Sequence, residues 1–531
     1  MNKVVNSVVS ALLSIAFIES IALGCYLSNE HLFVVIDRVS YPYSISPVAA
    51  TIVAILASAT SLALLALAKR RLESIALLLA VAMLIASMLW KATTLLVASS
   101  TLIAFVLALT RSIYSVIAIA VVSILQFIPV VSRAFGGPAW AGLELFNSIC
   151  ILISLASWTI SIPVRGINSM RLEPSPLPSS RRSEALMALA LTLLVAVSLY
   201  ALPYTKYLNP SGRAVSVDTI YYVKALESAR VKGVSIFLTK FGFGLDRVLY
   251  LLALYALSLI VGVKMSVIIA TLVSHALLVF SVWYLTYAIC GDCETSLLAA
   301  LLATISPQTL VFLYAGFNAN HAALPLLYIA YADLIRGRIR RAAVLQGLAA
   351  FVHTWAWLQL AVGMGLVALI MALKGDKKAR FFLFALIATA IVRQLVGGGI
   401  TGVLTISPLA RAPHYAVAIH NVALAKSLYA ISTFYVWGVL NAPFLYLLAA
   451  IDRVLNVDYL TPLFATTFIA FVGVMNVFFL VLRLVTNVPI AIPVALLAKR
   501  LVGKEKLAYS TSTVLIQLPA FIYFLINVVP K

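Results

Sequence analysis

Long apolar runs separated by short polar segments dominate the pattern along this 531-residue chain. A run of about 20 apolar residues is long enough to cross a bilayer as an α-helix, and such runs follow one another from end to end. Hydrophobic residues make up 63% of the chain and charged residues only 10%, against about 25% charged residues in a soluble domain. The pattern predicts an all-α polytopic membrane protein with about 17 transmembrane helices, plus a surface helix after a large outer loop.

The polar segments divide the chain into two membrane modules. Residues 1–163 hold six predicted spans, and no role for this module follows from the sequence. Residues 164–183 read PVRGINSMRLEPSPLPSSRR, and this basic, Pro/Ser-rich stretch predicts a cytoplasmic linker. Residues 184–531 form the second module, in which the outer loop 203–245 and the apolar surface stretch 246–263 follow a first span.

The later spans of the second module are predicted from the same apolar runs. They cover 184–202, 265–289, 295–315, 319–335, 342–356, 358–373, 381–397, 427–451, 459–482, 484–498 and 508–528. Several contain only about 15 residues, which is short for a span and predicts tilting or re-entrant packing.

The basic clusters set the orientation. RGRIRR (336–341), KGDKKAR (374–380) and KRLVGKEK (499–506) all face the cytoplasm if 246–263 lies on the membrane surface, and all face outward if it crosses. The positive-inside rule favours the first arrangement, which predicts a multi-pass cell-membrane protein with a cytoplasmic N-terminus. The net charge of +21 is then explained by these loops and by contact with membrane lipid, with no nucleic-acid partner.

Two of the four cysteines form the sequence CGDC at Cys290 and Cys293. A pair at this spacing is found in metal sites and disulfides, but the second pair that a zinc site needs is missing. We interpret the sequence as a tight turn between two helices.

Few carboxylates fall on the outer side in this topology. The second module contributes Asp218, Glu227 and Asp246. Asp218 opens the segment VDTIYY and is followed by Tyr221 and Tyr222. It has two interpretations, a helix N-cap and a general base for an incoming nucleophile, which are compatible. Asp246 has three, since it is placed to cap the surface helix, to pair with Arg247 or to face the same cavity.

Basic residues gather on the same outer side. Arg393 and Arg483 lie at outer helix ends, and Arg411 and His414 lie in the loop between them. Guanidinium groups match the oxygens of phosphate, so a phosphate or pyrophosphate is the expected partner. The alternative is that these side chains extend to lipid headgroups.

His321 and His353 lie near outer helix ends. A histidine at such a place is commonly a hydrogen-bonded structural residue, and no metal-ligand spacing links the two. No metal site is predicted. The cofactor is therefore unknown, and a divalent cation, although compatible with phosphate chemistry, is not indicated by the sequence.

Four segments of the second module, within about 184–505, resemble the GT-C superfamily of polyprenyl-phosphate-sugar-dependent membrane glycosyltransferases. They are the outer loop with Asp218, the Asp246–Arg247 pair before an apolar helix, the helix–Ser-Pro–loop–helix unit around GFNANHA, and Arg483 before a Pro-containing helix. None of the four is a strict motif. The resemblance implies a sugar donor linked to polyprenyl (dolichyl) phosphate, bound at the outer leaflet.

The resemblance also implies roles for individual residues. Asp218 would be the base for the acceptor hydroxyl, and Arg483, Arg393 and Arg411 would hold the donor phosphate. The remaining candidates, placed as accessory residues, are Asp246, Tyr221, Tyr222, His321, His353 and His414. The loop GFNANHA lacks the further carboxylate of many family members, and the tandem acidic pair and WWDYG-type motif found in others are absent. The sugar and acceptor are therefore left open.

Two other functions fit the same residues. A transporter or flippase for an anionic lipid-linked substrate would use the basic cavity without needing Asp218 as a base. A non-catalytic membrane assembly subunit would need neither. Replacement of Asp218 by Asn separates a glycosyltransferase from a transporter, because it should abolish sugar transfer in the first case and leave transport largely intact in the second.

Overall fold

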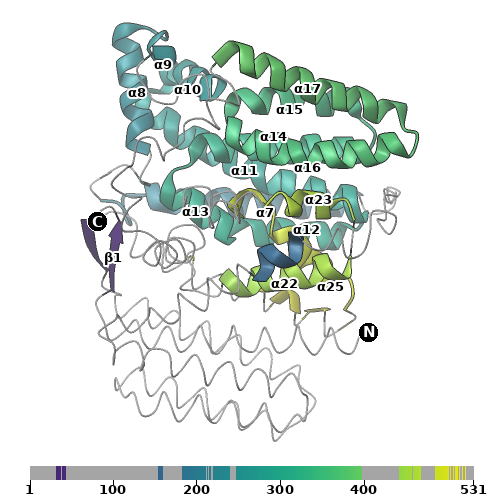
Figure 1. The fold of residues 1–531 in the computed structure, drawn as a ribbon. Helices are drawn as coiled ribbons and strands as arrows, with labels where there is room; N and C mark the ends of the chain where they lie inside the picture. The colour runs from purple at the N-terminus through teal and green to yellow at the C-terminus, as the bar shows by residue number, and fades with distance from the viewer. Residues whose placement is uncertain are drawn as a thin grey trace, which may run out of the picture.

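A computed structural model gives the fold of most of the second module and of small parts of the first. The described residues are 32–36, 39–43, 153–159, 182–210, 212, 215–216, 219–239, 247–397, 442–456, 458–467, 485–501 and isolated positions between 503 and 521. Helices prevail among them (Figure 1), as the apolar pattern predicts.

The described part of the first module is a β-hairpin and a short helical segment. Strands β1 (Leu32–Ile36) and β2 (Val39–Tyr43) pair antiparallel, within a segment predicted to be a loop, and they are an exception to the all-α prediction. Residues 153–159 are helical. The ring of Trp158 is packed edge-on against Phe464, with centroids 4.8 Å apart, so this segment joins the core of the second module. The six predicted spans otherwise lie outside the described residues, as does the linker before Arg182.

The second module is a succession of helices joined by short turns. It begins with α7 (Arg182–Ala201), the 3₁₀ turn η2 (Leu202–Tyr204), α8 (Thr219–Lys232), α9 (Ile236–Thr239), α10 (Val248–Val261) and α11 (Val263–Cys290). It continues with α12 (Cys293–Thr304), α13 (Pro307–Ala315), α14 (Asn318–Ile335), α15 (Ile339–Val352), α16 (Thr354–Leu373) and α17 (Lys377–Gly397). After 441 come α22 (Ala442–Leu455), α23 (Leu460–Ala465) and α25 (Ala491–Ala498).

Four described helical stretches are long and apolar enough to cross a membrane: Glu184–Tyr204, Val263–Cys290, Cys293–Leu313 and Thr354–Leu373. Their length and composition are those of membrane-spanning helices, and the helical fold of the described part agrees with the all-α prediction. By contrast, α10 has 14 residues, fewer than the approximately 20 needed to span, and Gly262 separates it from α11 with a φ of 84° that side chains rarely adopt. This break and this length favour a helix that does not cross.

Local sequence explains where helices α11 to α13 end. Gly291 adopts the left-handed conformation after α11, and the side chain of Asp292 accepts a hydrogen bond from the Thr295 N–H to cap α12. The predicted tight turn at CGDC is confirmed. The predicted span 295–315 is instead two helices, because Pro307 has no N–H to continue α12 and Ser306 caps α13.

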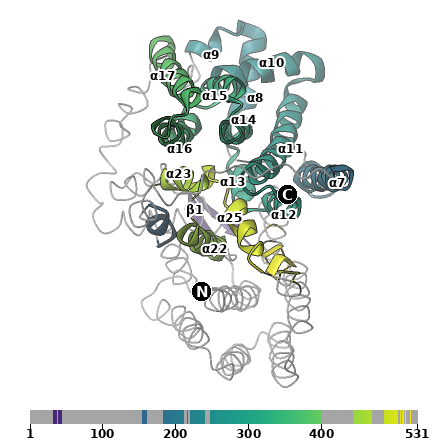
Figure 2. The ribbon, with the colours of Figure 1, turned by 90° about the vertical axis from the view of Figure 1, so that its right-hand side faces the viewer.

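Helix α14 lies at the centre of the module. Nearly all of its residues are buried, and α11, α15 and α16 pack around it. In Figure 1, α14 to α17 lie as nearly parallel rods, and Figure 2 looks along α14 and α16. Because successive helices run in opposite directions, the start of α14 and the α15–α16 junction lie at the same end of this bundle, which we call the polar end. The α14–α15 turn lies at the other, the basic end.

Contacts gather several basic loops at the basic end. Lys499 donates a hydrogen bond to the Cys290 carbonyl over 3.0 Å, and Lys506 pairs with Glu294 over 2.6 Å. The guanidinium of Arg336 lies 5.0 Å from the centre of the Tyr284 ring, near the end of α11. The turns after α11, α14 and α25 therefore meet, as expected if basic loops share one side of a membrane.

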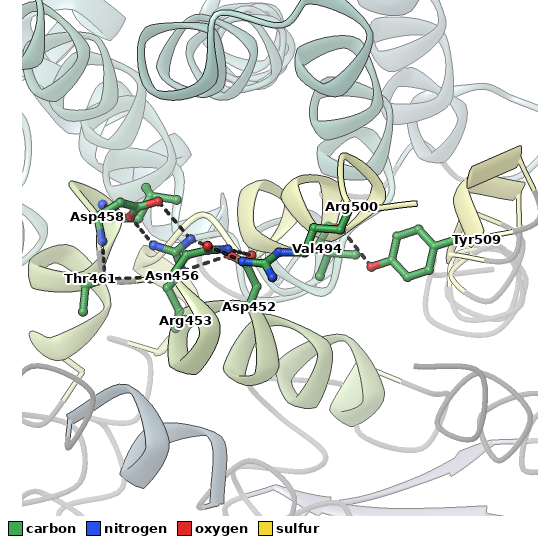
Figure 3. A network of polar contacts seen from close by, with 9 residues as sticks. Asp452, Arg453, Asn456, Asp458, Thr461, Val494, Arg500 and Tyr509 are labelled. Carbon is green, nitrogen blue, oxygen red and sulfur yellow. Dashed lines mark hydrogen bonds and ion pairs between the residues drawn. The ribbon is translucent and has the colours of Figure 1, made fainter. Parts of the chain in front are cut away.

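A buried ionic network lies at the C-terminal end of α22 (Figure 3). Arg453 pairs with Asp452 and Asp458, Asn456 donates to Asp452 over 2.8 Å, and Arg500 donates to Asn456. Burial would lower the pKa of Arg453, but the two carboxylates raise it, so the guanidinium stays charged. The network joins α22, the turn before α23 and the segment after α25. Breaking such a buried pair would leave an uncompensated charge, which is costly.

Substitution of Gly363 by Ala tests how closely α16 packs on α23. A Cβ at Gly363 would lie 3.1 Å from Leu463 Cα and 3.3 Å from the Pro462 oxygen, whereas one at Gly365 would lie 3.6 Å from Leu386 Cδ1. We expect Gly363→Ala to destabilise the protein by about 1–3 kcal/mol through overpacking. Gly365→Ala should leave stability unchanged or raise it, because Ala suits a helix interior better than Gly. Thermal melting in detergent, followed by tryptophan fluorescence, measures both, and equal melting temperatures would contradict this packing.

Candidate functional site

The start of α8 meets the start of α14 and of α10 at the polar end. The side-chain amide of Asn318 donates to Thr219 Oγ1 over 3.4 Å. The Tyr222 hydroxyl accepts a hydrogen bond from Arg247 over 2.9 Å and lies 3.5 Å from the Ala319 N–H, which donates to it. Thr219 directly follows Asp218 in the chain, and Arg247 directly follows Asp246. The segments that carry these two predicted carboxylates are thus connected through α14.

A second set of contacts continues from α14 across the bundle. Asn320 donates to Asn487 Oδ1 over 2.8 Å, Asn487 donates to Gln359 Oε1 over 2.9 Å, and Gln359 donates to Thr466 Oγ1 over 3.3 Å. All four side chains are buried. We call these two sets together the polar row: Thr219, Tyr222, Arg247, Asn318, Asn320, Asn487, Gln359 and Thr466.

Main-chain contacts fix the segment that carries Asn487. Gln308 donates to the Thr486 carbonyl over 2.5 Å and to the Tyr328 hydroxyl over 3.0 Å. Tyr328 in turn donates to the Asn487 carbonyl over 2.6 Å. An unpaired polar group in an apolar interior is costly, so these bonds specify how residues 485–490 lie against α13 and α14.

Arg393 is almost fully buried near the end of α17. Its Nε donates to Thr354 Oγ1 at the start of α16 over 2.9 Å, and its guanidinium lies 5.4 Å from the centre of the Phe351 ring. Gln359 of the polar row lies five residues further along α16, about 7.5 Å in helix rise. A positive charge is therefore held at the start of α16, the helix that carries Gln359 of the polar row.

The two predicted histidines make structural contacts. His353 Nδ1 accepts the Ala356 N–H over 3.1 Å and so caps α16. His321 is fully buried, with its ring stacked on Phe312 at 4.8 Å and its Nδ1 3.5 Å from the Tyr200 hydroxyl. These contacts match the structural interpretation of both side chains.

The other predicted site residues divide into two groups. Tyr222 belongs to the polar row, whereas its neighbour Tyr221 is exposed on α8. The remaining candidates lie outside the described residues, and their roles stay predictions; they are Asp218, Asp246, Arg411, His414 and Arg483. Within the part of the chain that the structure describes, no group of three or more His, Cys, Asp or Glu side chains is placed to hold a metal ion.

Sequence reasoning missed the buried amides of the row. Asn320, Gln359 and Asn487 are uncharged and carry no motif, so a search for carboxylates and basic residues passes over them. One signal was present, because an amide inside an apolar helical run must find a partner in a neighbouring helix. The segment FNANHA, with Asn318 and Asn320, and the segment VTNVP, with Asn487, carry that signal.

Comparisons with known proteins add no relative. No family model matches the chain, no curated protein matches it, and no solved structure matches it.

Substitution of Asn487 tests the polar row. Asn487→Leu removes the partner of Asn320 Nδ2 and of Gln359 Oε1, and two buried groups lose their hydrogen bonds. We expect a loss of stability of about 1–3 kcal/mol and a lower melting temperature in detergent. Thr286→Val is the matched control, because the buried Thr286 hydroxyl donates to the Val282 carbonyl of its own helix over 2.7 Å. Equal melting temperatures for the two variants would contradict a cooperative row.

Proposed function

We propose that this protein transfers a sugar from a polyprenyl (dolichyl) phosphate donor to an acceptor at the outer face of the cell membrane. It would act as a multi-pass membrane glycosyltransferase with about 17 transmembrane helices and a cytoplasmic N-terminus. The polar end of the bundle would face outward. The meeting of the basic loops at the opposite end supports this orientation, because such loops favour the cytoplasmic side.

One observation carries the proposal. The polar row takes a hydrogen-bonding residue from each of the four segments that resemble membrane glycosyltransferases. They are Thr219 beside Asp218, Arg247 beside Asp246, the Asn318–Asn320 turn, and Asn487 shortly after Arg483. Segments up to 268 positions apart in the chain thus converge at one end of the bundle, as the parts of a single site must.

The proposed chemistry divides between one carboxylate and several guanidinium groups. Asp218 takes the proton of the acceptor hydroxyl as that oxygen attacks the anomeric carbon of the sugar. The bond from this carbon to the phosphate oxygen breaks, and polyprenyl phosphate leaves. Arg393, Arg411 and Arg483 hold the phosphate and stabilise the negative charge that it gains.

The buried amides have a positioning role in this scheme. Asn320 and Asn487 keep the start of α14 in register with the segment that follows Arg483. A shift of about 1 Å between a base and a phosphate-binding group is enough to cost a large part of a reaction rate. The row would therefore act on the rate through geometry, without touching the reacting atoms.

Replacement of Asp218 tests the proposal. Membranes containing the wild type or Asp218→Asn receive a polyprenyl phosphate donor with a radiolabelled sugar, and the labelled acceptor and released polyprenyl phosphate are quantified. We expect a loss of at least about 100-fold in transfer, the lower range for a general base. Glu227→Gln, a like change at an exposed position of the α8 helix that follows Asp218, should retain the wild-type rate.

Two outcomes would overturn the proposal. Undiminished transfer by Asp218→Asn would remove the base. Movement of the intact lipid-linked sugar across the bilayer, equal in both forms and with no labelled acceptor, would favour a flippase.

A further inference from the structure

Two arginines pair with a single buried carboxylate at the basic end. Asp333, near the end of α14, is fully buried, while its partners Arg338 and Arg341 keep 50% and 55% of their side chains exposed. Arg341 Nε lies 2.9 Å from Asp333 Oδ2, and Arg338 lies 3.9 Å from Oδ1. The buried carboxylate thus holds two guanidinium groups by ion pairs, while about half of each arginine side chain stays exposed.

Two tyrosines on α11 hold a third arginine, Arg336. Arg336 lies 5.0 Å from the ring centre of Tyr284 and 5.1 Å from that of Tyr287. The Tyr284 hydroxyl donates to Asp333 over 2.7 Å and accepts from Arg338 over 3.0 Å. A cation held over aromatic rings is a directed contact, so the arginines are oriented by the fold and not merely attached to a loop.

The cluster has more positive charge than its own carboxylate can neutralise. Residues 333–341 contain four arginines and one acidic residue, Asp333. Arg340, the fourth arginine, is exposed beside the others. An anion with several oxygens is the ligand that such an arrangement recognises.

Exposed apolar stripes lead along the helices to this cluster. Val273 and Leu277 are about half exposed on α11, and their spacing places them on the face of Phe280 and Tyr284. Val344 and Leu348 are exposed on α15, at helical spacing from Arg341. Helices α11 and α15, which both pack against α14, thus each present an apolar stripe that ends in the arginine cluster.

We propose that this cluster, formed by Arg336, Arg338, Arg340 and Arg341 over Tyr284 and Tyr287, binds the headgroup phosphate of an anionic phospholipid. The acyl chains lie along the exposed stripes of α11 and α15. Aromatic residues at a membrane interface and basic groups between helices are the usual elements of such sites. The site is separate from the polar end, and its test does not depend on sugar transfer.

Binding of two lipids with identical acyl chains tests the site. Purified protein in detergent is titrated with a phosphoglycerol lipid or a zwitterionic phosphocholine lipid, and bound lipid is counted by native mass spectrometry. We expect the wild type to bind the anionic lipid and the double variant Arg336→Gln/Arg338→Gln to bind it at least tenfold more weakly. The double variant Lys377→Gln/Lys378→Gln, which removes two exposed charges from the start of α17, should bind as the wild type does.

A second variant separates an oriented site from charge alone. Tyr287→Leu keeps every charge and removes a ring beneath Arg336, and it should weaken anionic lipid binding, whereas Tyr287→Phe should not. Melting temperatures without added lipid identify any variant that has lost its fold. Equal weakening by both charge variants, equal binding of both lipids by the wild type, or displacement of the lipid by millimolar inorganic phosphate would overturn the proposal.

Discussion

The absence of water inside a bilayer is the constraint on which this structure depends. A charge or amide that enters the hydrocarbon region must find a partner within the protein. Asp333 and Asp452 are fully buried, and each has an arginine beside it. In the polar row, Asn320 donates to Asn487 and Asn487 donates to Gln359. The basic loops lie at the basic end of the helices. In the segment 333–341, four arginines share one acidic residue.

Helix α14 connects the two ends that this constraint creates. Its 18 residues span about 27 Å, and about 20 Å of this rise separates Asn320 in the polar row from Asp333 beneath the arginine cluster. One end carries hydrogen bonds between segments that are distant in the chain, which suits a site for chemistry. The other carries an excess of positive charge over aromatic rings, which suits contact with a charged lipid surface. A single buried helix therefore fixes the distance between the polar row and the arginine cluster.

The helices of this bundle were predictable because apolar length and terminal residues determine them. The predicted spans 265–289, 319–335 and 358–373 agree with α11, α14 and α16 to within four residues, and Gly291 and Asp292 mark a turn visible in the sequence. The break at Ser306–Pro307 was overlooked because hydropathy continues across it. The hairpin at 32–43 was overlooked because strand pairing leaves no clear signal in a short segment between apolar runs.

The candidate site was less predictable, for a physical reason. Charged residues stand out in an apolar chain, so Arg393, and Tyr222 in the segment opened by Asp218, were named as candidates, whereas the amides that connect the segments were not. Pairing of Asn320 with Asn487 depends on the packing of α14 against residues 485–490, and no local pattern encodes that packing. His353 shows the opposite case, since its capping of α16 follows from its place directly before the helix.

The opposite placement of the two ends across the membrane is the central claim, and cysteine labelling in intact cells tests it most directly. In a variant with all four native cysteines replaced, single cysteines are introduced by Arg230→Cys on α8 and Lys377→Cys on α17. A membrane-impermeant thiol reagent should label position 230 in intact cells and position 377 only after permeabilisation. Labelling of position 377 from outside, or of both positions from the same side, would contradict the account.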